Sequence, residues 1–182
     1  MSTKFSVRFI SELRNHPLPP KMQFAKQPLE SIGHVVLKLF TLVIFYDERF
    51  HVEPRLHDDN IPFVPDLAQL DYELRPARWF ECGATPAAKF DKLAVKVPQA
   101  ELWLVERSQA ELDIAKAEMA RLDLRRNRYR LLAFQPAVFD ELVQLFTGRN
   151  EVTLFQLDLA AGQIQFDFNG IWFDTELVLD VF

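Results

Sequence analysis

The apolar pattern is densest between residues 28 and 46, where only a few polar residues interrupt it. Four polar residues of this run recur at steps of four, four and three: Glu30, His34, Lys38 and Thr41. These steps place the four side chains on one stripe of an α-helix. Proline is tolerated at the first helical position, so we predict a helix from Pro28 to about Tyr46. A largely buried helix with one polar stripe indicates a polar, hydrated feature beside it.

Shorter stretches on either side of this helix have the alternation or the β-rich composition of strands. We expect strands at 4–10, 21–26, 49–54, 66–74, 77–81, 101–106, 129–134, 152–159, 163–168 and 171–182. Further helices are expected from Pro86 onwards, at 108–123 and at 137–146. Asn169-Gly170 between two strands predicts a hairpin turn. With no internal repeat and no linker, residues 1–182 are predicted to form a single domain.

A hairpin is predicted around the stretch "PDLAQLDYELRPARWFECG" (65–83). In a strand over 66–74, Asp66 heads an apolar face that runs on through Tyr72 and Leu74. The turn is expected near Arg75-Pro76, and the returning strand ends at Glu81. Antiparallel pairing therefore predicts that Asp66 and Glu81 lie close together.

A helix is predicted directly after this hairpin, with Thr85 as its cap and Pro86 as its first residue. Lys89 and Lys92 share one face of it, and helical side chains tilt toward the N-terminus, here toward Glu81. The strand at 101–106 completes a strand–helix–strand unit, in which the two strands run parallel.

Two carboxylates at neighbouring strand ends are ligands that suit Mg²⁺ or Mn²⁺. Asp66 and Glu81 are the candidate metal ligands and Glu30 is a candidate third one; a nearby lysine can orient water and stabilise phosphate charge. Each residue also has a structural interpretation. Glu30 suits a helix dipole, Asp66 a turn, and the lysines a solvated helix face. These alternatives stay open when each residue is taken alone.

The order helix Glu, Pro-Asp, strand-end Glu and Lys resembles the PD-(D/E)XK nuclease superfamily. That resemblance implies an α/β (mixed α+β) fold, with a restriction-endonuclease-like core, a mixed sheet flanked by helices, and added N- and C-terminal β-hairpins. The superfamily's lysine position is Gly83 here. In some branches the lysine has moved to the following helix, which implies Lys92 as the catalytic lysine, with Lys89 as second choice.

Within that superfamily, the chain resembles the bacterial YaeQ family most. "VPDLA" resembles that family's "EPDLW", and "WFECGATPAAKFDKL" resembles its "WIELGxPxxxRIxKA" without a gap, with Lys92 on the family's lysine. The chain departs from the family at Gly33, Ala68 and Lys89-Phe90. The resemblance implies a Mg²⁺-dependent nuclease or phosphodiesterase. The alternative is a non-catalytic binding protein with this fold, associated with transcription.

Composition and charge add expectations about binding partners and cellular location. The net charge of −5 argues mildly against a surface covered with DNA-binding positive charge. One stretch is nevertheless rich in arginine: Arg121, Arg125, Arg126, Arg128 and Arg130. This run is a candidate nucleic-acid contact, or else a solvated helix end and strand edge. The single cysteine, Cys82, allows no intrachain disulfide, and we expect it in the core. With no apolar signal core and no run long enough to span a bilayer, we predict a cytoplasmic protein without a membrane partner.

Overall fold

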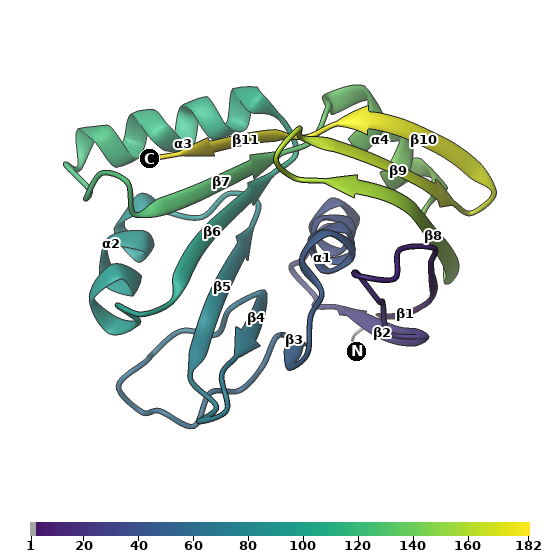
Figure 1. Cartoon of the computed structure of the whole chain (residues 1–182). Coiled ribbons are helices and arrows are strands. Elements are labelled where there is room, and N and C mark those ends of the chain that lie inside the picture. The colour runs from purple at the N-terminus through teal and green to yellow at the C-terminus, as the bar shows by residue number, and fades with distance from the viewer. Residues whose placement is uncertain (1–2) are drawn as a thin grey trace. The chain divides into compact units, whose positions relative to one another are not determined.

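The computed structural model describes residues 3–182 and has a mixed α+β fold (Figure 1). The chain divides into two compact units. Unit 1 comprises the residues up to Asp47 together with Phe134–Leu177, and unit 2 comprises Glu48–Ala133 with Val178–Phe182. Each unit contains one mixed β-sheet and two helices. The single domain over 1–182 stays a prediction.

The sheet of unit 1 has the strand order β10-β9-β8-β1-β2. Its strands are β1 (Thr3–Ser11), β2 (Lys21–Lys26), β8 (Arg149–Asp158), β9 (Gln163–Phe168) and β10 (Ile171–Glu176). β1 pairs antiparallel with β2 and parallel with β8. The predicted hairpin turn is confirmed between β9 and β10: Asn169 and Gly170 both have positive φ, as a two-residue type I′ turn requires.

Phenylalanines fill the core of unit 1. Along β9 every second side chain is buried, so that one face of the sheet is apolar. Phe40 from α1 (Ile32–Phe45) packs against Phe166 and Phe168 of this face and against Phe134. Phe139 of α4 (Pro136–Leu145) also contacts Phe134. The buried sheet face and the two helices therefore share one aromatic core.

The first helix begins later than predicted, at Ile32 instead of Pro28. Ser31 is its N-cap, and the Ser31 hydroxyl accepts a hydrogen bond from the His34 N–H at 3.1 Å. Before it the chain turns, with Glu30 N–H bonded to the Gln27 carbonyl at 3.1 Å. A serine cap satisfies an otherwise unpaired helical N–H, which a proline at the first position cannot do.

The sheet of unit 2 has the order β11-β7-β6-β5-β4-β3. Its strands are β3 (Phe50–Val52), β4 (Leu67–Leu70), β5 (Pro76–Cys82), β6 (Glu101–Glu106), β7 (Tyr129–Ala133) and β11 (Val178–Val181). β5, β6 and β7 run parallel, which confirms the predicted strand–helix–strand unit. The single strand predicted at 171–182 is wrong, because the chain breaks at Leu177 and β10 and β11 join different sheets.

Helices α2 (Ala87–Lys96) and α3 (Gln109–Arg121) of unit 2 pack on one face of the parallel strands. The core between them includes Trp79 of β5, Leu104 of β6 and Tyr129 of β7. Phe90 of α2 meets the Tyr129 ring edge-on. This face matters because the same strands carry charged residues at their carboxyl ends.

The hairpin of β4 and β5 turns earlier than predicted. β4 ends at Leu70, and the side chains of Tyr72 and Leu74 are exposed, so the predicted apolar face stops there. The Asp71 carboxylate accepts hydrogen bonds from the Glu73 and Arg75 N–H groups at 2.8 and 2.9 Å. Such a side-chain-closed turn competes with strand pairing.

Among the described residues, no helix combines the length and the apolar character needed to cross a bilayer.

Candidate metal centre

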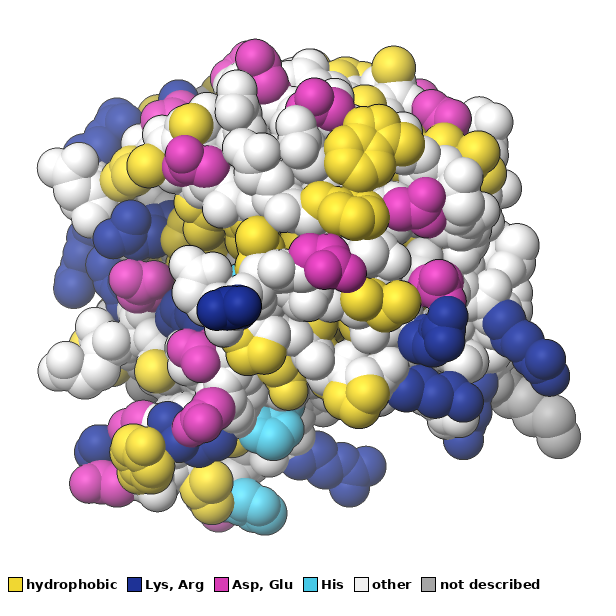
Figure 2. Space-filling view, turned by 45° about the vertical axis from the view of Figure 1, so that its right-hand side comes forward, with side chains coloured by type: hydrophobic (Ala, Val, Ile, Leu, Met, Phe, Trp, Pro, Cys, Tyr) yellow, Lys and Arg dark blue, Asp and Glu magenta, His cyan; other side chains and the backbone are white. Residues whose placement is uncertain are grey.

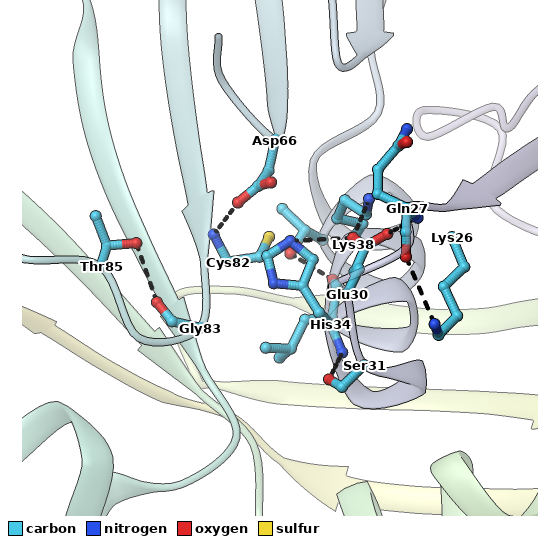
Figure 3. A network of polar contacts seen from close by, with 12 residues as sticks. Lys26, Gln27, Glu30, Ser31, His34, Lys38, Asp66, Cys82, Gly83 and Thr85 are labelled. Atoms are coloured by element: carbon cyan, nitrogen blue, oxygen red, sulfur yellow. Dashed lines mark hydrogen bonds and ion pairs between the residues drawn. The ribbon is translucent and has the colours of Figure 1, made fainter. Parts of the chain in front are cut away.

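The hairpin brings together the two carboxylates predicted to bind a metal. The β4–β5 ladder ends with Leu67 opposite Phe80, and Asp66 lies directly before β4, near enough to Glu81 for its charge to act on that carboxyl. The Asp66 N–H donates to the Phe80 carbonyl at 3.1 Å. The Asp66 carboxylate in turn accepts a hydrogen bond from the Cys82 N–H at 2.7 Å (Figure 3). Backbone groups of β5 therefore hold both the main chain and the carboxylate of Asp66 in place.

Glu81 is held inside unit 2, with only 4% of the residue exposed. Its Oε1 atom accepts a hydrogen bond from the indole N–H of Trp79 at 2.8 Å. The ammonium group of Lys89 lies 2.6 Å from the same oxygen. Because both partners use Oε1, the described residues place no donor on Oε2.

Burial and three neighbouring groups determine the pKa of the Glu81 carboxyl. Burial has the largest effect and raises the pKa of the Glu81 carboxyl above its ordinary value, and the charge of Asp66 acts in the same direction. Lys89 and the Trp79 indole act in the opposite direction. Since the charge of Asp66 acts on Glu81, a cation bound between them would offset both the cost of burying the charged Glu81 and the repulsion between the two carboxylates.

Of the two candidate lysines, Lys89 forms the ion pair with Glu81. Lys89 lies in the first turn of α2 and its side chain is 24% exposed, whereas Lys92 lies one turn further along and is exposed. The helix begins differently from the prediction: Pro86 is the N-cap, and the Thr85 hydroxyl donates to the Gly83 carbonyl at 3.1 Å. The positive φ of Gly83 turns the chain from β5 toward α2.

The donor set fits Mg²⁺ in its usual mode of binding. Mg²⁺ is commonly held by one or two carboxylates while water and substrate phosphate fill its other positions. Asp66 and Glu81 provide two carboxylates, and Oε2 of Glu81 has no donor from the described residues. Within residues 3–182, no group of three or more His, Cys, Asp or Glu side chains is arranged to hold a metal ion.

Glu30 belongs to a polar cluster of unit 1. It precedes α1 and its carboxylate forms ion pairs with Lys38 and, at 3.3 Å, with His34 (Figure 3). Lys38 is only 1% exposed, so the pair is buried. The predicted polar stripe on α1 thus exists, and Thr41 donates to the Leu37 carbonyl at 2.7 Å within it. Glu30 as a third metal ligand stays a prediction.

Two buried residues of unit 2 escaped the sequence prediction. Trp79 stands two positions before Glu81, and strand alternation alone could have placed both on one face. Glu106 ends β6 and is 4% exposed. Burial raises its pKa to about 8, and a hydrogen bond to Glu111 adds to this rise. The signal for Glu106 was its position at the carboxyl end of a buried parallel strand.

Most of the arginine run makes contacts inside unit 2. Arg128 donates to the carbonyls of Val97 and Ala100 and so closes the end of α2, and Arg126 stacks over the Phe182 ring at 4.2 Å. Arg130 lies 3.7 Å from Glu101, and Arg121 lies 4.0 Å from Glu118. Arg125 is exposed. A nucleic-acid contact by these arginines stays a prediction.

No family model matches this chain, and no curated protein matches it either. In fold, the chain is similar to the YaeQ protein from Xanthomonas axonopodis pv. citri, with a TM-score of 0.76 over 98% of both chains at 15% identity. It is also similar to the YaeQ protein from Pseudomonas syringae, with a TM-score of 0.74 over 98% of this chain and 94% of the other, again at 15% identity. The chain therefore has the fold of these proteins.

Proposed function

We infer that the chain is a YaeQ protein of the PD-(D/E)XK type, and we propose that it is a Mg²⁺-dependent phosphodiesterase acting on nucleic acid. The fold shared with two YaeQ proteins over nearly the whole chain supports the first part. One observation supports the second: Lys89 from the helix after β5 forms an ion pair with the buried Glu81, and the charge of Asp66, directly before β4, raises the pKa of that glutamate.

In this proposal Asp66 and Glu81 bind the cation through carboxylate oxygens. Bound Mg²⁺ supplies Lewis-acid stabilisation of phosphate charge and lowers the pKa of water. The Cys82 N–H orients Asp66, and the Trp79 indole orients Glu81. Both orienting bonds exist before any ligand arrives, so little reorganisation is needed when the cation binds.

Lys89 has the role of the superfamily's lysine. Its ammonium neutralises Glu81 in the protein alone, and its partly exposed side chain can turn toward a bound phosphodiester. There it donates hydrogen bonds to a phosphoryl oxygen and to the attacking water. Water adds to phosphorus, the bond from phosphorus to the leaving oxygen breaks, that oxygen takes a proton from solvent, and the water's proton is released to solvent.

The test is cleavage of short single- and double-stranded DNA and RNA by the wild-type protein, with Mg²⁺, with Mn²⁺ and with a chelator. We expect cleavage of at least one substrate that requires the cation. A folded protein that binds Mg²⁺ and cleaves none of them would contradict the catalytic proposal and favour the non-catalytic binding protein. Failure to bind either cation would contradict the metal centre itself.

A further inference from the structure

Outward-facing hydrophobic side chains form a patch on the sheet of unit 1. Trp172 is 53% exposed, Phe155 is 39% exposed, and their rings lie 5.0 Å apart. Ile10 of β1 is 37% exposed and neighbours Thr153 of β8 on the same face. We call Ile10, Phe155 and Trp172 the aromatic patch. The solvent face of such a sheet is normally polar, so these side chains are out of pattern.

Ordinary strand alternation turns Phe155 outward. Along β8 the side chains at 150, 152 and 154 are buried, and those at 151, 153 and 155 lie on the other face. The β8–β9 register shifts between Leu154 and Gln156, so Phe155 is the extra residue of a bulge and has no direct partner on β9. Its ring lies against that of Trp172, although β9 lies between β8 and β10.

The surroundings of the patch are acidic. Asp167 is the direct cross-strand partner of Trp172, and Asp174 follows Trp172 by two positions on the same face. Glu176 continues that face along β10, the edge strand of the sheet. Arg8 of β1, two positions before Ile10 on the same face, donates to Glu151 at 2.6 Å. Figure 2 brings the β8–β10 side forward and shows large hydrophobic side chains among acidic ones.

We propose that the aromatic patch and its acidic rim bind a positively charged segment of another protein, with an arginine or lysine stacked on Trp172. An exposed tryptophan is the ring that attracts a cation most strongly, and tryptophan is enriched at the centres of protein interfaces. The acids beside it repel phosphate groups, which disfavours nucleic acid and anionic lipid. They also repel an identical face, which disfavours a second copy of this chain.

The test uses a 12-residue peptide of alternating arginine and glycine as the probe, at physiological salt. The same peptide with citrulline replacing arginine is its neutral control. Binding is followed by the NMR signal of the Trp172 indole N–H, since Trp79 and Trp103 are buried. We expect the arginine peptide to shift the Trp172 signal and the citrulline peptide to leave it unchanged.

Two variants and two matched controls locate the binding. Binding by the variants is measured by isothermal titration with the arginine peptide, because Trp172→Ala removes the NMR signal itself. Trp172→Ala should weaken binding about fivefold or more, the scale of one cation–π contact. Ile114→Ala removes an exposed apolar side chain of α3 and should not weaken it. Asp174→Asn should weaken it severalfold while Asp113→Asn does not, although both aspartates accept a bond from a glutamine amide.

Several outcomes would overturn the proposal. The arginine peptide could leave the Trp172 signal unshifted, or could bind Trp172→Ala as tightly as wild type. Asp174→Asn and Asp113→Asn could weaken binding equally, or a single-stranded oligonucleotide could shift the Trp172 signal more than the arginine peptide does. A dimer in sedimentation that Trp172→Ala dissociates would also overturn it, because the face would then bind a second copy.

Discussion

Two buried glutamates end neighbouring parallel strands of unit 2 and differ in their partners. Glu81 is the penultimate residue of β5 and Glu106 the last of β6, both on the face that carries α2 and α3, and each is 4% exposed. Glu81 meets a lysine and an indole N–H, which oppose the effect of burial on its pKa. Glu106 meets Glu111, which reinforces that effect. Equal burial is therefore opposed by the neighbours of Glu81 and reinforced by the neighbour of Glu106, so the two carboxyls differ in what they can bind.

The largest expected effect comes from removing the Asp66 carboxylate. Asp66→Ala should abolish both Mg²⁺ binding and cleavage, because Glu81 would then be the one ligand left of the proposed pair. Isothermal titration with Mg²⁺ and the cleavage assay measure the two losses separately. Asp140→Ala, an exposed aspartate of α4, is the control. Normal Mg²⁺ binding by Asp66→Ala would remove Asp66 from the metal centre.

Much of the fold and part of this site could be predicted from the sequence. The hairpin of β4 and β5 could be predicted from strand pairing, a short-range rule, and in it the charge of Asp66 acts on the Glu81 carboxyl. The resemblance implies Lys92 before Lys89, whereas the structure places Lys89 on Glu81. The two lysines are three residues apart and share one helix face, so they differ in position along the axis, and Lys89 in the first turn lies nearer to the strand end.

The parts that escaped prediction are those decided by tertiary partners. Glu106 reads as an ordinary strand end until Glu111 from the next helix is seen beside it. The C-terminal run reads as one strand, but Leu177 marks its passage from one sheet to another. Neither the local alternation nor the composition of these segments encodes the neighbour that they acquire on folding.

The next largest effect separates two lysines of one helix. Lys89→Ala should leave Mg²⁺ bound but slow cleavage by roughly 10²- to 10³-fold, the scale of losing one electrostatic stabiliser. Lys92→Ala is the matched control, since it removes the same charge one turn away, where the side chain is exposed. Single-turnover cleavage of the same substrate measures both. The reverse order of effects would assign the role to Lys92, the residue first predicted.

A third prediction tests the second glutamate of the comparison, Glu106. In the folded chain its pKa of about 8 lies above the ordinary 4.5, so the folded state holds a proton that the unfolded state has lost. Its contribution to stability is complete below about pH 4.5 and disappears as the pH rises through 8. Glu106→Gln keeps a donor toward Glu111 without titrating. As the pH rises from 6 to 9, the wild type should therefore lose about 2 kcal/mol of unfolding free energy that Glu106→Gln keeps.

Urea unfolding at pH 6 and pH 9 measures this difference. Glu118→Gln, a half-exposed glutamate of α3, serves as the control and should show no such difference from wild type. If wild type and Glu106→Gln lose stability in parallel between these two values, the proton is not held on Glu106, and the contrast with Glu81 disappears.

The smallest expected effect concerns the bond that orients Glu81. Trp79→Phe removes the indole N–H from Oε1, and this bond lowers the pKa of the Glu81 carboxyl. The pKa should rise further, so Mg²⁺ competes with a more tightly held proton, and its affinity should fall about threefold to tenfold at pH 6. The deficit should shrink as the pH rises toward 9 and the carboxyl loses its proton. Trp103→Phe is the matched control, because the Trp103 indole likewise donates to a glutamate two residues away, Glu101, at 3.3 Å. Mg²⁺ titrations across this pH range distinguish a change in protonation from a packing defect, which would weaken binding equally at every pH.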